Sequence, residues 1–441
     1  MNMAKHSNGN RQPNRQSYTT EESVESSQRF PFRNFWILPL AYFILTVTAG
    51  VPLSLWDTGK ADFNDAAAHW ERVSMILAGH IVPSISPGNS EYVGYTTSSG
   101  FVTLNNTAIN SPFLYWPSLL SGGRQQVASV LTLVLSAAVI AVAIWLAQRF
   151  QILLFAAAIL PATFLMMIYP TADAVTDSTS FLFIGLVLFL LQQPQLRWHH
   201  WVALCAVSVM LGQIKMTAIV LILLVLLLIR KLSGWKKFWL MAPVMLAATS
   251  SWLWSRQVSW FAPAPFMVSY ADYTKLKWEC VQQPWAWITS IFKTAFMPLN
   301  LSTENVNGIP VNAQRNLTLF TATEGTQLGN VTMVPVLFAI VLLTLYSASL
   351  AHLRSWFSNG IAAVVLVGFF VATVTALLIS WTGSIGGYAW GMQFRYFLPV
   401  IPVAFLLIPR FFRCDRPKFL LWFCGALIAW SYIGTVIAHL W

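Results

Sequence analysis

Residues 126–147 read QVASVLTLVLSAAVIAVAIWLA, a stretch without a charged side chain. About 20 apolar residues in a helix cross the hydrocarbon core of a bilayer, so this stretch predicts a transmembrane helix. The whole chain agrees, because 56% of its 441 residues are hydrophobic and 9% are charged, against roughly 25% charged in a typical soluble domain. These proportions exclude a soluble globular protein and predict an all-α integral membrane protein.

Similar apolar runs recur from residue 35 onward, and Trp residues cluster beside them as interfacial anchors do. A re-entrant or tilted pair is an alternative for the two shortest runs, 201–214 and 216–229. Two passes are preferred there, because a single pass would place the basic residues at 230–237 on the outer face. We predict about 11 transmembrane helices, near residues 35–55, 126–147, 151–169, 178–192, 201–214, 216–229, 238–258, 331–350, 360–381, 394–411 and 419–438.

The net charge of +11 is unevenly distributed. If the N-terminus is cytoplasmic, the predicted inner segments hold most of the 26 Lys and Arg residues and all of the excess positive charge. This is the positive-inside pattern of membrane proteins, so the basic character of the chain requires no nucleic-acid partner. We expect a multi-pass protein of the cell membrane with its N-terminus in the cytoplasm and its C-terminus outside.

Residues 1–34 are rich in Ser, Asn, Gln and Arg and lack apolar periodicity, which predicts a disordered cytoplasmic tail. Residues 35–441 are expected to form one polytopic domain with long outer loops at about 56–125 and 259–330. The four cysteines have the spacing of neither a disulfide framework nor a metal site. Loops on a rigid scaffold commonly carry function, so we expect the functional site on the outer face.

The first outer loop predicts a short helix after Asn64 or Asp65, because a capping residue precedes an Ala run. Asp65, His69 and Arg72 share a face of that helix, and Asp62 lies just before it. Such a carboxylate can take a proton from a sugar hydroxyl while His69 or Arg72 sets its charge. The alternative is a solvated charged face with an acidic N-cap. Asp62, Asp65 and His69 also form a loose set of divalent-cation ligands, so the cofactor is left open.

A second candidate is the segment YAWGMQFRYFLP at 388–399, which follows the glycine-rich turn TGSIGG at 382–387. It delivers Gln393 and Arg395 to the start of a predicted span. A guanidinium matches phosphate geometry, so Arg395 is suited to hold the phosphate of a lipid-linked substrate. The alternative, an arginine that snorkels to the headgroups, is less consistent with the positive-inside rule on an outer face.

Three more acidic or basic residues lie near the predicted outer face. Lys215 sits between two short apolar runs, where it either binds the same phosphate or snorkels to the interface. Asp173 and Asp177 lie at another outer turn, and we expect one to cap the next span and the other to face the cavity. The aromatic segment SPFLYWP at 111–117 either lies in the membrane interface beside a lipid substrate or anchors its loop.

Short motifs recur in a recognisable order: Pro52, then DAAAH at 65–69, ADAVT at 172–176, and QFRYFLP at 393–399. In this order the sequence resembles the DUF2142 family of bacterial polytopic membrane proteins, over most of the chain. The pattern of that family has an outer Pro…Asp-Glu-x-x-His segment and a late Gln-Gly-Arg-Tyr-Phe-x-Pro segment. The family is similar in architecture to GT-C glycosyltransferases, which use polyprenyl-phosphate sugars.

The resemblance implies that Asp65 is a catalytic base and that His69 and Arg395 are supporting or phosphate-binding groups. Two positions depart from the family pattern. Ala66 stands where the family has Glu, and Phe394 stands where it has Gly. A mechanism with two carboxylates would therefore need Asp62 or Asp57 in place of the missing Glu.

We therefore expect an outward-facing, inverting glycosyltransferase that moves a sugar from a polyprenyl-phosphate donor to a cell-envelope glycan or lipid-linked acceptor. Asp65 would deprotonate the acceptor, and Arg395, with Lys215 or Arg72, would neutralise the departing phosphate. A transporter or flippase for lipid-linked sugars is less favoured, because every acid maps to a loop or turn rather than to a span. A non-catalytic partner in a glycan-assembly complex is the third alternative.

Overall fold

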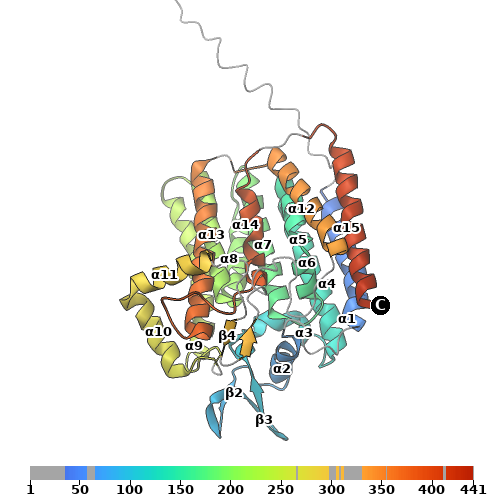
Figure 1. The fold of residues 1–441 in the computed structure, drawn as a ribbon. Coiled ribbons are helices and arrows are strands. Elements are labelled where there is room, and N and C mark those ends of the chain that lie inside the picture. Colours follow the sequence, from blue (N-terminus) through green and yellow to red (C-terminus); the bar gives the residue numbers. More distant parts are fainter. Residues whose placement is uncertain are drawn as a thin grey trace, which may run out of the picture.

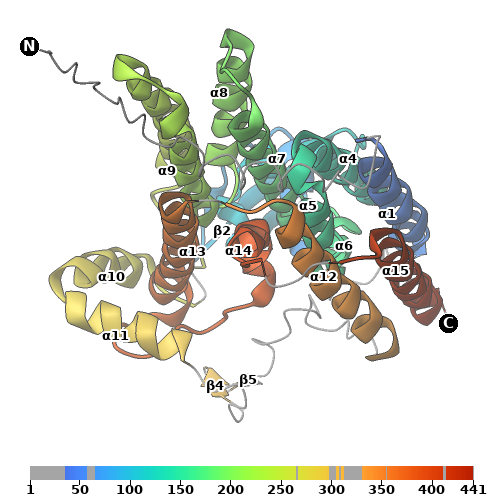
Figure 2. The ribbon, with the colours of Figure 1, turned by 90° about the horizontal axis from the view of Figure 1, so that it is seen from above.

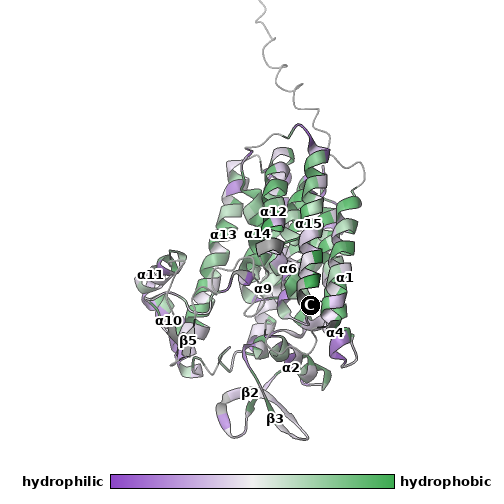
Figure 3. Cartoon of the chain, turned by 45° about the vertical axis from the view of Figure 1, so that its right-hand side comes forward, coloured by the Kyte–Doolittle hydropathy of each residue, from purple (hydrophilic) through white to green (hydrophobic). Residues whose placement is uncertain are grey.

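The computed structural model describes residues 35–56, 65–264, 267–296, 304–306, 309–311, 330–353, 355–410 and 414–440. Within these ranges the chain forms a bundle of helices with a group of short helices and strands at one end (Figure 1). Apolar residues predominate along the bundle, whereas α10 (Tyr270–Gln282) and the β-hairpin carry more hydrophilic residues (Figure 3). The predicted tail at 1–34, Asp57 and Asp62 lie outside the described residues.

Six helices of the described ranges are long and apolar enough to cross a membrane, so the prediction of an all-α, multi-pass membrane protein is confirmed. A seventh candidate is the pair formed by α5 (Gln151–Ala158) and α6 (Pro161–Met167), bent by 76°. The bend falls at Pro161, which has no N–H to continue the helix. The six helices are α1 (Ile37–Trp56), α4 (Gln125–Leu146), α7 (Ala172–Gln192), α12 (Asn330–Leu350), α13 (Trp356–Leu377) and α15 (Pro417–Leu440).

The other four predicted spans are helical but shorter. One of them, η4, is a 3-10 helix of 16 residues. At about 2.0 Å per residue it reaches about 32 Å, whereas an α-helix of that length would reach about 24 Å. η4 is therefore long enough to cross a hydrocarbon core although it has only 16 residues. The count of eleven spans stays a prediction. The four regions are α8 (Trp198–Gln213), η4 (Met216–Lys231), η5 (Gly234–Leu240) with α9 (Met241–Gln257), and η8 (Phe394–Val400) with α14 (Ile401–Leu406).

Contacts sort the connecting segments into two groups, one at each end of the bundle. At the end with the strands, which we call the cavity end, the contacts are Asp65–Arg395, Ser111–Gln213, Ile109–Trp254 and Gly386–Lys293. At the opposite end they are Phe35–Gln151, Arg149–Gln192, Gln193–Lys231 and Arg230–Phe357. The two groups match the predicted outer and inner segments. Which end faces the cytoplasm remains a prediction from charge.

The first long loop is more ordered than predicted. It contains α2 (Ala66–Leu77), a three-stranded antiparallel sheet and short helices η1 (Asn106–Ile109), η2 (Pro112–Tyr115) and α3 (Trp116–Leu119). The strands are β1 (Ser84–Ser86), β2 (Asn89–Thr97) and β3 (Gly100–Leu104), with Val93 opposite Leu104. A small apolar core of Met75, Val93, Leu104 and Ala108 joins this unit to Phe261 after α9. The loop is therefore a folded lid over the cavity end.

Helix α7 lies at the centre of the bundle, and 83% of its most apolar 18-residue stretch is buried. It approaches α4 closely at Gly185, where a Cβ atom would lie 2.5 Å from the carbonyl oxygen of Ala143. Small residues permit such contacts between membrane helices. This packing fixes the position of α7, and with it the first turn of α7 at the cavity end.

We expect Gly185→Ala to lower the free energy of unfolding by about 1–3 kcal/mol, because the added methyl group overpacks the contact between α4 and α7. Gly425→Ala on α15 is the matched control, since a Cβ there meets no atom within 4 Å. In that open position the same change should be neutral or stabilising by about 0.5–1 kcal/mol. Thermal unfolding in detergent compares the two variants, and equal melting temperatures would contradict the close approach.

Candidate functional site

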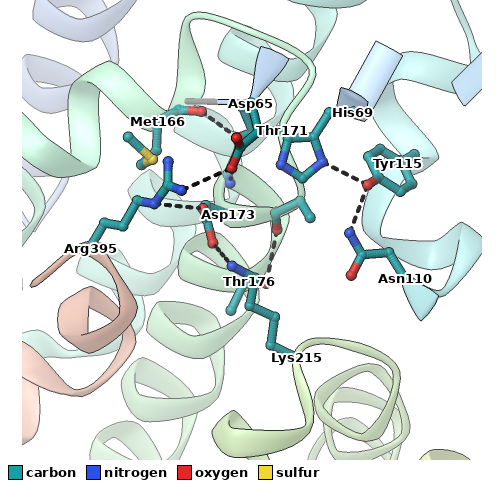
Figure 4. A network of polar contacts seen from close by, with 12 residues as sticks. Asp65, His69, Asn110, Tyr115, Met166, Thr171, Asp173, Thr176, Lys215 and Arg395 are labelled. Atoms are coloured by element: carbon teal, nitrogen blue, oxygen red, sulfur yellow. Dashed lines mark hydrogen bonds and ion pairs between the residues drawn. The ribbon is translucent and has the colours of Figure 1, made fainter. Parts of the chain in front are cut away.

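Four charged side chains from four separate segments meet at the cavity end (Figure 4). The guanidinium of Arg395 lies 3.1 Å from a carboxylate oxygen of Asp65 and 3.8 Å from one of Asp173. The ammonium of Lys215 pairs with the other carboxylate oxygen of Asp173. The sequence analysis named all four residues, and the structure joins them into one network.

Asp173 lies in the first turn of α7, where the helix dipole favours a negative charge. The N-cap is Thr171, whose hydroxyl accepts from the amide of Ala174 at 3.2 Å and donates to the carbonyl of Met166 at 2.7 Å. The prediction that Asp173 or Asp177 caps this helix is therefore wrong. Because Thr171 satisfies the helix end, the Asp173 carboxylate is available to the two cations.

Asp65 directly precedes α2 and adopts a left-handed conformation, with φ 58° and ψ 27°. Asp tolerates this region better than most residues. Asp65 occupies the N-cap position, as predicted, but its side chain makes no capping hydrogen bond to α2, so the alternative in which its carboxylate caps the helix is wrong. The carboxylate instead turns to Arg395, and its side chain stays 40% exposed, whereas those of Arg395 and Asp173 are each 5% exposed.

His69 lies one turn after Asp65 and is buried. Its Nδ1 atom lies 2.7 Å from the hydroxyl of Tyr115, which accepts a hydrogen bond from the side-chain amide of Asn110 at 2.8 Å. If the Tyr115 hydroxyl donates its proton to Nδ1, neutral His69 carries its own proton on Nε2. Burial lowers the pKa of His69 to about 4, and burial also raises the pKa of Tyr115. His69 is thus neutral at physiological pH.

Tyr115 and Asn110 were not predicted as site residues. The segment 111–117 carried an aromatic signal, but the signal favoured the membrane interface or a loop anchor equally. The structure supports the anchor, since Tyr115 is fully buried and Ser111 donates to the side chain of Gln213 at 2.7 Å. The aromatic segment therefore fastens the lid to α8.

Arg72 takes a different place from the one predicted. Its side chain is fully buried, and it donates to the carbonyl oxygens of Asn110 and Ile81, each at 2.9 Å. Burial lowers its pKa to about 10, so it stays charged. The side chain does not line the cavity, and its donors hold the lid together rather than pointing to a substrate.

A cavity of about 800 Å³ opens beside this network. Its charged end is lined by Asp65, His69, Asp173, Lys215 and Arg395, all of which were predicted as site residues. Gln393, a sixth predicted residue, lines the cavity as well. The ring of Tyr396 lies beneath both cations, with its centroid 5.2 Å from the Lys215 nitrogen and 5.8 Å from the Arg395 guanidinium carbon. The rest of the lining is rich in aromatic rings and hydroxyl groups, including Trp254, Tyr273, Trp381, Trp390, Ser255 and Thr373.

The aromatic wall is held by specific contacts. The indole N–H of Trp254 donates to the carbonyl of Ile109 at 2.7 Å, which fixes the ring. Trp381 packs on Gly391, where a Cβ atom would lie 2.7 Å from the indole nitrogen. Gly391 also has φ +72°, a conformation that glycine adopts readily. A side chain at this position would therefore displace the wall.

Asp177 lies one turn beyond Asp173, inside the bundle. It is 1% exposed, and its Oδ2 atom has no hydrogen-bond partner in the described part of the chain. Its charged neighbours are Asp173 and Lys215. The prediction that every acid maps to a loop or turn is therefore wrong, because Asp173 and Asp177 both belong to the spanning helix α7.

In the described residues no three His, Cys, Asp or Glu side chains gather as metal ligands. The predicted divalent-cation set includes Asp62, which lies outside them. Comparisons of the chain with known protein families, with curated proteins and with solved structures each find no match. What the site can do therefore follows from its own residues: two cations beside a cavity, and one partly exposed carboxylate.

The buried His69 should make the stability of the lid depend on pH. An exposed histidine in the unfolded chain has a pKa near 6.5, above the folded value of about 4. Between these values the unfolded chain binds more protons, so this contribution is complete above pH 6.5 and is lost as the pH falls toward 4. We expect a loss of about 3 kcal/mol from this residue.

Melting temperatures measured across this pH range check the expectation. His69→Gln should remove most of the extra pH dependence, because glutamine does not titrate. His80→Gln, at an exposed histidine of the same loop, should follow the wild type. Parallel curves for all three proteins would show that His69 is not held neutral by burial.

Proposed function

We propose that the protein is a membrane glycosyltransferase that moves a sugar from a polyprenyl-phosphate donor to a glycan or lipid-linked acceptor. The observation that carries the proposal is the pairing of Arg395 and Lys215 with carboxylates at one end of a cavity of about 800 Å³. This volume lies in the range of ligand sites. Cations there suit the leaving phosphate, and aromatic rings with hydroxyl groups suit sugar rings.

In the proposed reaction Asp65 accepts the proton of the acceptor hydroxyl. The acceptor oxygen then bonds to the anomeric carbon, and the bond from that carbon to the phosphate oxygen breaks with its electron pair on the phosphate. Arg395 and Lys215 neutralise that charge as it develops. One displacement inverts the anomeric configuration. His69, neutral and hydrogen-bonded to Tyr115, turns its Nε2 atom toward the charged cluster (Figure 4).

The resting network implies an order of events. Asp65 is bound to Arg395 at 3.1 Å, so this carboxylate oxygen is not free to meet an acceptor hydroxyl. A donor phosphate that binds Arg395 competes with Asp65 and releases it. The base is therefore active only after the donor has bound, which favours ordered binding with the donor first.

The finer architecture belongs to the same proposal. Eleven passes with a cytoplasmic N-terminus would place the cavity end on the outer face of the cell membrane, as the positive-inside rule expects. A polyprenyl-phosphate donor would reach it from the bilayer. The likeness of 65–69 and 393–399 to the DUF2142 pattern, and of that family to GT-C enzymes, supports the chemistry by analogy alone.

We expect Asp65→Asn to lower sugar transfer by about 10²–10⁴-fold, the usual worth of a general base. Arg395→Ala should lower it comparably and weaken donor binding, and Arg395→Lys should recover part of the loss, since it keeps the charge without the planar fork. The measurement is the composition of the extracted envelope glycan in a deletion strain complemented at equal membrane abundance. Asp272→Asn, at an exposed position on α10, is the matched control.

Loss of the same sugar in both site variants would support the transferase and identify the substituent. A normal glycan in both would place the chemistry elsewhere. If deletion removes the sugar while Asp65→Asn restores it fully, the protein serves as a non-catalytic partner in glycan assembly.

A second candidate function, transport of a lipid-linked sugar, is favoured by Asp177. Buried ionisable residues inside spanning helices commonly mark ion or proton pathways. Asp177 lies one turn beyond Asp173 in α7 and takes no part in the proposed transfer reaction. A coupled transporter would need this group to gain and lose a proton.

Asp177→Asn separates the two functions. A transferase should keep at least about half of its activity, because the amide keeps the shape of the side chain and the carboxylate touches no reacting atom. A proton-coupled transporter should lose uptake by tenfold or more and lose its dependence on the pH gradient. The assay compares sugar transfer by the purified protein with sugar movement in proteoliposomes, using Asp177→Asn and wild type at equal amounts.

A further inference from the structure

Helix α11 (Pro284–Ala295) braces the wall of the cavity through one of its faces. The hydroxyl of Ser290 accepts from the amide of Gly386 at 2.7 Å, and that of Thr294 accepts from the amide of Ala389 at 2.9 Å. The ammonium of Lys293 donates to the carbonyl of Gly386 at 2.7 Å. These bonds hold the segment 383–391, which contains Trp390 and leads into Gln393 and Arg395.

The opposite face of α11 is apolar and uncovered within the described chain. Trp285, Phe292 and Phe296 follow one another at spacings of seven and four, which places them on one stripe. They are 78%, 60% and 78% exposed, and the rings of Phe292 and Phe296 stack at 6.5 Å. On the neighbouring α10, Trp278 and Val281 are also exposed. We call this stripe, Trp285, Phe292 and Phe296, the α11 apolar face.

Orientation and depth indicate what covers this face. α11 extends sideways from the bundle, and the view along the bundle shows it lengthwise beside α13 (Figures 1 and 2). Trp287 donates to Thr375 at 2.9 Å, and Thr375 lies seven residues before the end of the α13 span at Thr382, which sets α11 in the half of that span toward the cavity end. A helix of 12 residues is about 18 Å long, too short to cross a bilayer but suited to lie in its interface.

Charge and continuity favour lipid over a protein partner. The sequence of α11 contains one lysine and no acid, as expected beside phosphate headgroups. Large aromatic rings are the side chains that prefer the interface. Val364 and Val367 of α13 are exposed, and Figure 2 shows α13 on the same flank of the bundle as α11. A bilayer that surrounds α13 therefore meets α11 at its surface.

We propose that the α11 apolar face inserts into the bilayer interface at the cavity end, and that this lipid contact holds the segment 383–391 in place. The α11 apolar face would bind lipid while the polar face of the same helix binds the segment 383–391. The membrane would then help to support the cavity wall. The proposal does not depend on the transferase function, because it concerns the position of a wall that either a transferase or a transporter would need.

A position-specific fluorophore tests the lipid contact. In a variant with the four cysteines replaced by alanine, an environment-sensitive dye is attached at Phe292→Cys or, as control, at Ser98→Cys in the exposed turn between β2 and β3. In lipid nanodiscs the dye at 292 should shift to shorter wavelength and be quenched by nitroxide lipids but not by aqueous iodide. The dye at 98 should show the reverse.

Two results would overturn the proposal. Quenching at 292 by iodide and not by nitroxide lipids would show that the face is in water. Protection from both quenchers would show that protein, either a second copy or another partner, covers it.

Hydrogen exchange tests the coupling to the cavity wall without an activity assay. The amides of Gly386 and Ala389 should exchange slowly in wild-type nanodiscs. Phe292→Glu, which places a charge against the lipid, should speed their exchange about tenfold or more by local opening, and Phe292→Leu should retain protection. Unchanged exchange in Phe292→Glu would show that the lipid contact does not support the wall.

Discussion

The guanidinium of Arg395 is the contact on which the cavity end depends, because it binds Asp65 and Asp173 together across 330 and 222 positions of sequence. A buried cation is costly unless it is paired, and removal of either partner leaves charge without compensation. Three segments are therefore fixed relative to one another: the start of the lid, the first turn of α7 and the entry to η8. Lys215 completes the network by neutralising the second oxygen of Asp173.

Much of this arrangement could be predicted from the sequence. Apolar runs predicted helices in all eleven places, because apolar length is a strong local signal. The spacing of Asp65 and His69 predicted one face of a short helix, and Arg395 stood out as a rare outer-face cation. That these residues share a cavity followed from topology, since loops on one side of a bundle meet.

The remainder depended on contacts between distant residues. The spacing from His69 to Arg72 permits a shared face, but the carbonyls that turn Arg72 inward come from Ile81 and Asn110, outside its helix. The strands of the lid lack a clear alternation in sequence, and their register is set by pairing. Hydropathy did not predict that η4 is a 3-10 helix, because it gives the number of apolar residues in a run and not their rise per residue. Thr171 rather than Asp173 caps α7, because the carboxylate of Asp173 is paired with Lys215 and Arg395 from distant segments.

The network also determines which carboxylate can yield to a substrate. The two cations and two carboxylates of the network have a net charge of zero. A phosphate that binds adds negative charge, so one of the carboxylates must give up its contact with a cation. Asp173 is held by both Lys215 and Arg395 and is nearly sealed from water, so its release would leave a desolvated charge. Within the described residues Asp65 has one charged partner, and its side chain is 40% exposed, so water can solvate it as it leaves. Asp65 is thus the carboxylate that is easiest to displace, and once freed it faces the cavity. Binding of the phosphate is therefore coupled to the release of a carboxylate that can act as a base.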